Sequence, residues 1–425
     1  MEITVRLQVK FNQVMQKYQP YFSLPEYKFL RQICYGILTS KHVHINKIGA
    51  VLQEYISLKK TTERLSRNLG RKGFWAKLTR AHLEVNKRAL RRCEYLILDI
   101  SDITKSYAQQ MEGLEYVRDG SRKSVGLGYW LTNVIAVDES GEEIVPAYSE
   151  LYALQQEKSP EVSENQKILE AISTVQDVLG KEQVIVDDRG GDRRVLIERF
   201  LEEGRYFIIR QTGQRDLHTG KKRTSLRSIS RKIRLHYHFT VTKERHGKRK
   251  VETYVCGAKR VYFPNAHTDS YWETPLWLVK AQRKGKGALW YLCSLPVEDE
   301  QSAIEMAMRG YGLRWRIEEY HRQIKSDYHL EEICLRRYAA LKNFLSLFLV
   351  TMGFVYHHFG SLSLAILRDS SLKLVYRGTR LKEYFGFIYY KIAKALCWYF
   401  SKFKLKNRVY FPAKKVDNQL TFDFL

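Results

Sequence analysis

The chain has 425 residues, and 44% of them are hydrophobic, so it can bury a sizeable core and form two or three domains. Its 72 Lys and Arg outnumber its 46 Asp and Glu, which gives a formal net charge of +26. Such an excess excludes an ordinary charge-balanced enzyme surface and indicates a polyanionic partner, most often nucleic acid. A basic membrane-surface protein is the competing interpretation. However, the longest apolar run, residues 344–356, is too short to span a bilayer, and no N-terminal stretch resembles a signal peptide.

The cysteines and histidines give little sign of a metal site. The six cysteines are scattered without a CxxC pair, which argues against disulfides and a cysteine-based zinc site and fits a reducing cytoplasm. The pairs His42/His44 and His236/His238 have the spacing that places both side chains on one face of a strand. No second ligand pair of suitable type and spacing lies nearby in the sequence, so we expect no zinc site.

Residues 1–92 are predicted to be mainly helical. The stretch from Leu58 to Arg92 is rich in Lys and Arg, with Phe74 and Trp75 interleaved and Tyr55 just before it. A solvated helical face would have a similar composition. The net charge of the chain favours a helical DNA-end-binding domain over residues 1–92.

At Tyr95 the pattern changes to that of a buried strand. The run Tyr95 to Asp99 is almost wholly apolar and ends in an acid, as expected of a strand whose last side chain faces a site. Asp102 follows closely and suits a cap or turn. Residues 124–137 and 143–154 alternate in polarity and predict two further strands, joined by a turn at residues 139–141.

A second strand that ends in acids follows a predicted helix at residues 164–179. Residues 184–192 (VIVDDRGGD) place Asp187 and Asp188 directly after an apolar run, with two glycines that allow a tight exit. A helix over 193–203 and a strand over 206–210 come next. Strands alternating with helices predict an α/β sheet for residues 93–211.

Residues 212–296 interrupt that alternation and predict a β-rich insertion. Residues 221–250 contain twelve Lys or Arg against a single acid, Glu244. Four β-like runs follow at residues 235–241, 252–262, 274–282 and 288–295. The turn at residues 284–287 (KGKG) is predicted to be a hairpin tip, whose lysines could reach phosphates or simply be solvated.

Helix is predicted again from about Asp299, through residues 311–325 (YGLRWRIEEYHRQIK) and beyond Arg337, within a segment of residues 297–370. At about 100° per residue, four side chains fall within about 60° of each other on one helical face, with Arg322 at its edge: Tyr311, Arg314, Glu318 and Lys325. Leu313, Ile317 and Ile324 are offset toward the core. A carboxylate among cations could be only an ion-paired surface face. Residues 371–425 mix bases with aromatics and predict a C-terminal helical region, for which dimerisation is a candidate role.

The spacing Tyr311-x2-Arg314-x3-Glu318-x6-Lys325 resembles the YREK signature of a group of DDE transposases from bacterial insertion sequences, the insertion-sequence-4 group. The resemblance covers about residues 95–340. It implies that Asp99 and Asp188 are the first two catalytic acids and that Glu318 is the third. The implied fold is α/β with an RNase H-like catalytic core, a β-rich insertion, and helical N- and C-terminal regions.

Further roles are also implied by the resemblance. Tyr311, Arg314 and Lys325 would hold phosphates near the cut, with Arg322 and Arg189 as further DNA contacts. In family members that cut through a DNA hairpin, an aromatic in the region of Trp290 stacks on a flipped base. A buried strand Trp is also an ordinary core residue. The protein would act as a homodimer on paired DNA ends.

The chemistry follows from the acids. Two Asp and one Glu can hold two divalent ions roughly 3.5–4 Å apart, which activate an oxygen nucleophile and stabilise a leaving oxyanion at a phosphodiester. Oxygen ligands select Mg²⁺ or Mn²⁺ over zinc. Two choices remain open. Asp188 is favoured over Asp187, and Asp99 is favoured over Asp102.

The sequence therefore predicts a cytoplasmic, nucleoid-associated transposase. It would cut double-stranded DNA at terminal inverted repeats and join the 3′-OH ends to target DNA. A non-catalytic DNA-binding regulator, or a decayed transposase, is the alternative from a different class. A related nuclease that acts on branched or hybrid nucleic acid is a third possibility. Mg²⁺-dependent cleavage separates the first from the second.

Overall fold

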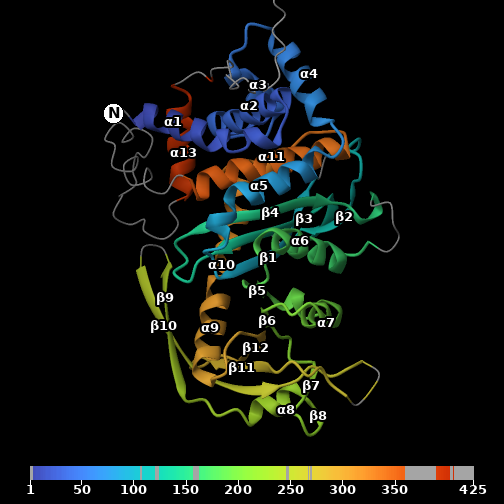
Figure 1. Ribbon diagram of the computed structural model, residues 1–425, viewed down its shortest axis with the longest axis vertical. Coiled ribbons are helices and arrows are strands. Elements are labelled where there is room, and N and C mark those ends of the chain that lie inside the picture. The colour runs from blue at the N-terminus through green and yellow to red at the C-terminus, as the bar shows by residue number, and fades with distance from the viewer. Residues whose placement is uncertain are drawn as a thin grey trace, which may run out of the picture.

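The computed structural model describes residues 3–105, 108–119, 124–156, 162–245, 248–266, 268, 270–358, 389–402 and 405. A layer of helices from both ends of the chain lies at the top of Figure 1, and one large mixed sheet extends below it. The fold is therefore mixed α/β, as predicted. The base-rich aromatic segment around Tyr384, Phe385 and Phe387 lies outside the described residues.

The helices expected in the first 92 residues are present, and they pack against late elements of the chain. The Ser23 amide donates to the Glu26 carboxylate at 2.9 Å and so caps the start of the most buried one, α2. Asn343 of α11 (Tyr338–Tyr356) donates to the Leu69 and Arg71 carbonyls, at 2.6 Å each. The N-terminal helices are α1 (Ile3–Gln16), η1 (Gln19–Tyr21), α2 (Leu24–Ser40), α3 (Ile45–Leu52), α4 (Leu58–Leu69) and α5 (Phe74–Leu90).

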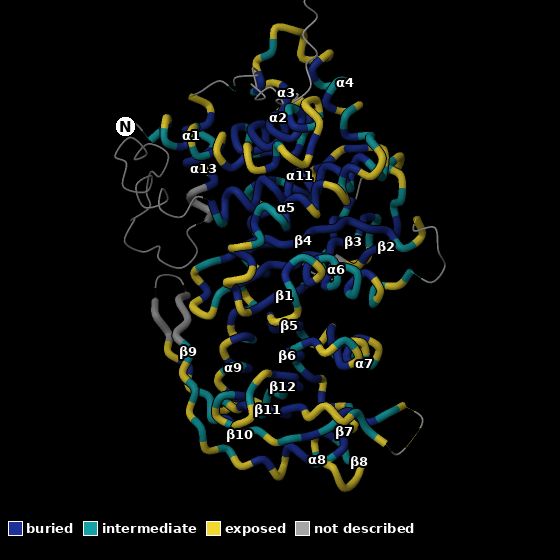
Figure 2. Tube along the Cα trace, in the orientation of Figure 1, coloured by how far each residue is buried: buried dark blue, intermediate teal, exposed yellow. Residues whose placement is uncertain are grey.

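The last helices complete this layer. α11 is the one described helix that is long and apolar enough to cross a membrane, but 89% of its apolar window is buried inside the protein. It lies between α2, α5 and strand β4, and α13 (Tyr389–Phe400) packs beside α2. Figure 2 shows this layer as mostly buried. α11 is thus a core helix that joins the N-terminal helices to the sheet.

The sheet has the strand order β2-β3-β1-β5-β6-β12-β11-β10-β9, with β4 also paired to β3. β1 runs antiparallel to β3 along its whole length, but it pairs with the parallel strand β5 only from Tyr95 to Ile97. The first half of the sheet consists of β1 (Tyr95–Thr104), β2 (Glu115–Asp119), β3 (Ser124–Val137), β4 (Ile144–Tyr152), β5 (Val184–Asp187) and β6 (Phe207–Arg210).

One prediction about β1 is wrong. The strand does not end at Asp99 but continues to Thr104, because β3 goes on pairing with it up to Gly128. Asp99 instead lies two residues past the end of the β1–β5 pairing, where that edge of the strand becomes free. The acid therefore faces an opening in the sheet without ending its strand.

The β-rich segment continues the same sheet, because β12 pairs with β6. The predicted hairpin at residues 284–287 is present between β11 and β12, with Gly285 in the left-handed region at φ 72°. The elements here are β7 (Asp216–His218), β8 (Arg223–Ser225), α8 (Leu226–Arg231), β9 (Tyr237–Arg245), β10 (Lys248–Val261), β11 (Leu276–Gln282) and β12 (Leu289–Ser294).

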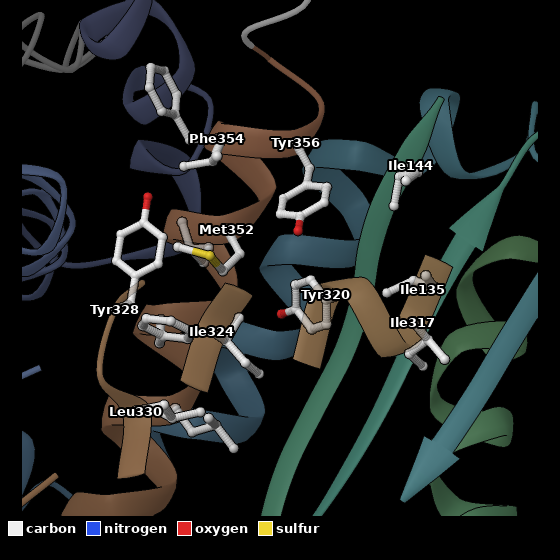
Figure 3. Packing of buried hydrophobic residues seen from close by; sticks show 14 of the residues in the cluster. Ile135, Ile144, Ile317, Tyr320, Ile324, Tyr328, Leu330, Met352, Phe354 and Tyr356 are labelled. Atoms are coloured by element: carbon white, nitrogen blue, oxygen red, sulfur yellow. The ribbon is translucent and has the colours of Figure 1, made fainter. Parts of the chain in front are cut away.

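Helices cover both faces of the sheet. One face packs against α6 (Glu164–Leu179), α7 (Arg194–Glu202) and α8, and the other against α9 (Glu300–Leu313), α10 (Trp315–Ser326) and the helical layer. Figure 3 shows Ile317, Tyr320 and Ile324 of α10 packed among residues of β3, β4 and α11. The apolar face predicted for the signature segment is thus confirmed as core.

The predicted continuous helix from Asp299 past Arg337 is broken. α9 ends at Leu313, Arg314 lies at the junction, and α10 starts at Trp315. A non-helical segment with one short turn, η4 (Leu330–Glu332), then separates α10 from α11. Because of this break, Tyr311 lies on α9 and Glu318 on α10, and Arg314 lies at the junction between the two helices.

Candidate active site

Arg314 joins three carboxylates that come from three separate parts of the chain. Its Nη2 lies 3.1 Å from Asp99 Oδ1 and 3.3 Å from Asp188 Oδ2, and its Nη1 pairs with Glu318 Oε1. The Arg314 side chain is 13% exposed, whereas that of Glu318 is 57% exposed. The structure thus places the three acids predicted from the sequence around one guanidinium, at the edge of the protein.

The backbone after β5 explains how Asp188 reaches this cluster. Asp188 has extended φ and ψ angles and caps η3 (Arg189–Gly191) by accepting from the Gly190 amide. Gly191 packs so closely that an added Cβ would lie 2.5 Å from an Asp187 carboxylate oxygen. A glycine is therefore required at this exit from the strand.

Asp187 and Asp188 point to different sides. Val184 and Val186 belong to the core on the α10 side of the sheet, and Ile185 to the opposite core, so alternation puts Asp188 on the α10 side. Burial and the neighbouring charge of Asp188 together raise the pKa of Asp187 to about 8. Of the two, it is Asp188 that contacts Arg314 among the described residues, so the geometry favours Asp188.

Asp99 is held by a relay of side chains that the sequence reasoning missed. Ser149 Oγ donates to Asn133 Oδ1 at 2.7 Å, and Asn133 Nδ2 donates to His321 Nε2 at 3.0 Å. The proton of this imidazole is then on Nδ1, which lies 3.5 Å from Asp99 Oδ2. Burial, together with the cations Lys325 and Arg314, lowers the pKa of His321 to about 3. The ring is therefore neutral.

One sequence signal could have found part of this relay, since His321 is one helical turn beyond Glu318 in the signature helix. Asn133 required the fold, because only the β1–β3 register places it opposite Asp99. Burial raises the pKa of Asp99 to about 6, Arg314 acts to lower it, and Asp188 and Glu318 act to raise it. Three crowded carboxylates of this kind favour a bound cation.

The remaining predicted DNA contacts lie around this cluster in different settings. Lys325 Nζ is 3.4 Å from Asp102 Oδ1 and 3.2 Å from Glu331 Oε1, which assigns Asp102 to Lys325 and not to Arg314. The Tyr311 ring packs on Tyr291 with centroids 4.7 Å apart.

Arg322 and Arg189 form no ion pair with the three acids of the cluster in the described structure. Arg322 is 65% exposed and pairs with Glu319 at 3.2 Å. Arg189 is exposed on η3, beside Asp188. Both are free to meet a ligand from solvent, so their assignment as DNA contacts stays a prediction.

Trp290 lies on the opposite side of the sheet from Tyr311. It packs against the core beneath α8, while its strand neighbour Tyr291 belongs to the core on the α10 side. Its indole N–H donates to Ser230 Oγ at 2.7 Å. Base stacking by Trp290 stays a prediction, and it would require the indole to leave Ser230.

A cavity of about 240 Å³ opens beside the acids. Its walls include Asp99, Asp187 and Asp188, with Trp130 and the Glu164–Arg193 ion pair at its side. The donor set of Asp99, Asp188 and Glu318 is made of hard oxygens, which suits divalent cations such as Mg²⁺ or Mn²⁺. Arg314 supplies positive charge at the point where such cations would be held.

Comparisons with known proteins identify the family of the chain. Residues 129–352 match the family model described as Transposase DDE domain, which includes Asp188 and Glu318 but begins after Asp99. No curated protein matches the chain. Among solved structures, the chain is similar to a piggyBac transposase in a synaptic complex with hairpin DNA. The identity is 11%, the TM-score is 0.42, and the match covers 88% of this chain and 72% of that one.

Proposed function

The chain belongs to the Transposase DDE domain family and is a DDE transposase, and we propose that Asp99, Asp188 and Glu318 are its catalytic and metal-holding carboxylates. We further infer that it belongs to the insertion-sequence-4 group, from the spacing of Tyr311, Arg314, Glu318 and Lys325. Its reaction would be cleavage of DNA at terminal inverted repeats, followed by joining of the 3′-OH ends to target DNA.

One observation supports this assignment most strongly: a single guanidinium, that of Arg314, contacts all three acids. Two divalent cations, Mg²⁺ or Mn²⁺, would activate the attacking oxygen and stabilise the leaving oxyanion when bound. Asp99, Asp188 and Glu318 would hold these ions. His321 Nδ1, 3.5 Å from Asp99 Oδ2, would help to orient the Asp99 carboxylate.

The cations of the signature would bind the DNA. Once the carboxylates are neutralised by metal, the Arg314 guanidinium is available to grip a phosphate in a bidentate manner. Lys325 contributes a point charge, and Tyr311 and Arg322 flank the strand. Trp290 and Arg189 would contact DNA next to the cut, with stacking on Trp290 worth about 1–3 kcal/mol if the indole turns outward.

The surrounding regions fit roles on DNA. We infer an RNase H-like core over residues 93–211 and 297–370, with residues 212–296 as the β-rich insertion. Tyr55, Ile56 and Leu58 are exposed next to Lys59 and Lys60, which suits a DNA-end-binding role for residues 1–92. A homodimer on paired ends, with residues 371–425 in dimerisation, and action on cytoplasmic nucleoid DNA complete the proposal.

The test uses purified protein and a labelled duplex that carries one end of the element with its flanking DNA. Glu318→Gln removes one anionic ligand but keeps the side-chain shape, so we expect cleavage in Mg²⁺ to fall by a factor on the order of 10³ while DNA binding persists. The matched control is Glu305→Gln, since Glu305 is exposed on α9 and bonds only Gln301 among the described contacts.

The wild type and the control should nick at the element boundary in Mg²⁺ and not in EDTA. Cleavage by Glu318→Gln at the rate of the control would remove Glu318 from the catalytic set. If a protein–DNA complex forms but no lane shows a nick, the wild type included, then DNA binding alone remains as the activity of the chain.

A further inference from the structure

A second cluster of metal-ligating groups lies apart from the acids. His42 and His44, between α2 and α3, meet Glu332, 288 positions after His44, in the segment that follows α10. His42 Nε2 is 3.2 Å and His44 Nε2 is 3.9 Å from Glu332 Oε2, and one ligand atom from each of the three lies within 4.8 Å of the other two. The pair His42/His44 was visible in the sequence, and the fold brings Glu332 next to it.

The spacing of these atoms suits one tetrahedral ion. Zinc–nitrogen and zinc–oxygen bonds of about 2.0–2.2 Å place neighbouring tetrahedral ligand atoms about 3.3–3.5 Å apart. The His42–Glu332 distance is already near this value, and the His44–Glu332 distance is a few tenths of an ångström longer. The ligand atoms of His42 and His44 lie within 4.8 Å of each other, so the histidine side chains have to move inward to close the set around an ion.

A fourth residue orients the carboxylate. His329 Nδ1 lies 3.0 Å from the other Glu332 oxygen, Oε1, and the His329 ring stacks on His42 with centroids 4.8 Å apart. Two parallel rings cannot both aim a nitrogen at the same ion, so His329 acts on Glu332 and not as a ligand. Ligating carboxylates are commonly held by such a second hydrogen bond.

The two segments are fixed against each other independently of the cluster. Lys41 and His329, just before the ligands in each segment, both have left-handed backbones, at φ 55° and 58°. Lys41 Nζ is 3.3 Å from Asp327 Oδ1, and the Lys105 ammonium binds the Glu331 and Ile333 carbonyls. The ligands are therefore brought together by a rigid frame and not by a chance meeting of long side chains.

We propose that His42 Nε2, His44 Nε2 and Glu332 Oε2 form a zinc site, with water in the fourth position and His329 holding the carboxylate. Two imidazoles and one carboxylate favour Zn²⁺ over Mg²⁺, unlike the oxygen-only set of the active site. The Glu332 side chain is 50% exposed, which gives the ion an entry path. Binding at His42 Nε2 puts the ring proton on Nδ1 and so displaces the 3.2 Å contact from the His44 amide to Nδ1. Binding at His44 Nε2 likewise displaces the 2.7 Å hydrogen bond from this nitrogen to the Glu332 carbonyl oxygen.

The site would tie the N-terminal helices to the end of the signature segment. His42 and His44 belong to the helical layer, while Glu332 adjoins Glu331, the partner of Lys325. Zinc at this point would hold the chain after α10 in place without taking part in the phosphoryl transfer. This inference does not depend on the proposed function.

The experiment measures Zn²⁺ binding by the full-length protein after treatment with EDTA and its removal. Titration calorimetry in excess Mg²⁺ should give one Zn²⁺ per chain, and Co²⁺ in its place should give the visible absorption of a tetrahedral ion. Thermal unfolding should shift upward with Zn²⁺. Glu318→Gln should bind Zn²⁺ as the wild type does, which separates this site from the acid cluster.

Variants complete the test. His42→Ala, His44→Ala and Glu332→Gln should abolish the one-to-one binding, and His329→Ala should weaken it about 10–100-fold. His236→Ala is the matched control, because it removes a histidine of the other i, i+2 pair and should bind as the wild type does. Absent binding, or binding that survives His42→Ala and His44→Ala, would overturn the proposal and leave the cluster as ion pairs with Glu332.

Discussion

Arg314 and Glu318 of the acid cluster lie at the start of α10, His329 and Glu332 of the histidine cluster follow its end, and the two clusters are built in opposite ways. In the first, three carboxylates surround one cation, Arg314. In the second, three imidazoles surround one carboxylate, Glu332. The same helix therefore connects a site of hard oxygen ligands to a site of nitrogen ligands, which select different metals.

The clusters also differ in what holds them together. Asp99 comes from the sheet, Asp188 directly follows a strand of it, and Arg314 and Glu318 lie at the start of α10, which packs on the sheet. The histidine cluster bridges the N-terminal helical layer and the segment after α10. Loss of charge balance should therefore disturb the acid cluster, and loosening of the helical layer should disturb the histidine cluster.

Removing the central cation gives the largest expected effect on stability. Arg314→Ala leaves three carboxylates without their partner, so we expect the free energy of unfolding at pH 7 to fall by about 3–5 kcal/mol. Mg²⁺ should restore part of this loss, because it supplies the missing charge. Denaturant unfolding with and without Mg²⁺ measures both effects.

The control for this prediction is Arg322→Ala. Arg322 is exposed and pairs with Glu319, so its loss should change stability by no more than about 0.5 kcal/mol. Equal effects of the two variants would show that Arg314 is an ordinary surface arginine. A stability of Arg314→Ala that does not respond to Mg²⁺ would separate the acids from metal binding.

A buried histidine makes the helical layer sensitive to pH. His82 of α5 donates from Nε2 to the Pro146 carbonyl of β4 at 2.8 Å, and its Nδ1 contacts the Tyr18 hydroxyl at 3.0 Å. Burial lowers the pKa of His82 to about 4. The neutral ring is favoured in the folded state, so stability is full above about pH 6.5 and falls as pH drops toward 4.

The expected loss over that interval is on the order of 3 kcal/mol. His82→Gln should be less stable at pH 7 but should show a flatter pH dependence between 6.5 and 4 than the wild type. His236→Gln should keep the slope of the wild type. An unchanged slope in His82→Gln would show that other groups control the acid sensitivity of this layer.

The smallest predicted effect concerns the relay to Asp99. His321→Ala should lower Mg²⁺-dependent cleavage about 10–100-fold, because the Asp99 carboxylate loses its orienting donor. His321→Asn should recover part of the activity, since its amide N–H lies near the position of Nδ1, whereas His321→Gln should not.

If His321 had only a structural role, the His321→Asn and His321→Gln variants would have equal cleavage activity. Cleavage rates are therefore measured against Mg²⁺ concentration, and we expect the loss in His321→Ala to include a higher Mg²⁺ requirement. Equal activity of the Asn and Gln variants would mean that His321 only fills space beneath Asp99.

The sequence was enough to place the acid cluster but not its details. Asp188 and Glu318 were found because each follows a local pattern, an apolar strand in one case and fixed helical spacing in the other. The end of β1 was misplaced, since only pairing with β3, which no local pattern reports, carries the strand past Asp99. The break at Arg314 was missed because it is only one residue long and Arg314 keeps helical φ and ψ angles, so the helical periodicity runs through it.

The histidine cluster shows what a single sequence does not reveal. His42 and His44 were noticed, but their partner Glu332 lies in a segment between α10, which packs on the sheet, and α11, which packs against α2. Contacts of this kind arise from the tertiary fold, and neither spacing nor composition encodes them. His321 was likewise hidden in a helix whose other residues seemed to account for its function.

The most direct test of the central claim uses Fe²⁺ as a cutting probe, since it needs no knowledge of the terminal repeats. Fe²⁺ bound in place of Mg²⁺, with ascorbate and peroxide, generates radicals that cut the polypeptide near the ion. With Zn²⁺ already added to fill the histidine cluster, we expect cuts close to Asp99, Asp188 and Glu318. They should disappear with excess Mg²⁺ and in the double variant Asp99→Asn/Glu318→Gln. Cuts elsewhere, or cuts that persist in that variant, would contradict the claim that these three carboxylates hold the catalytic metal.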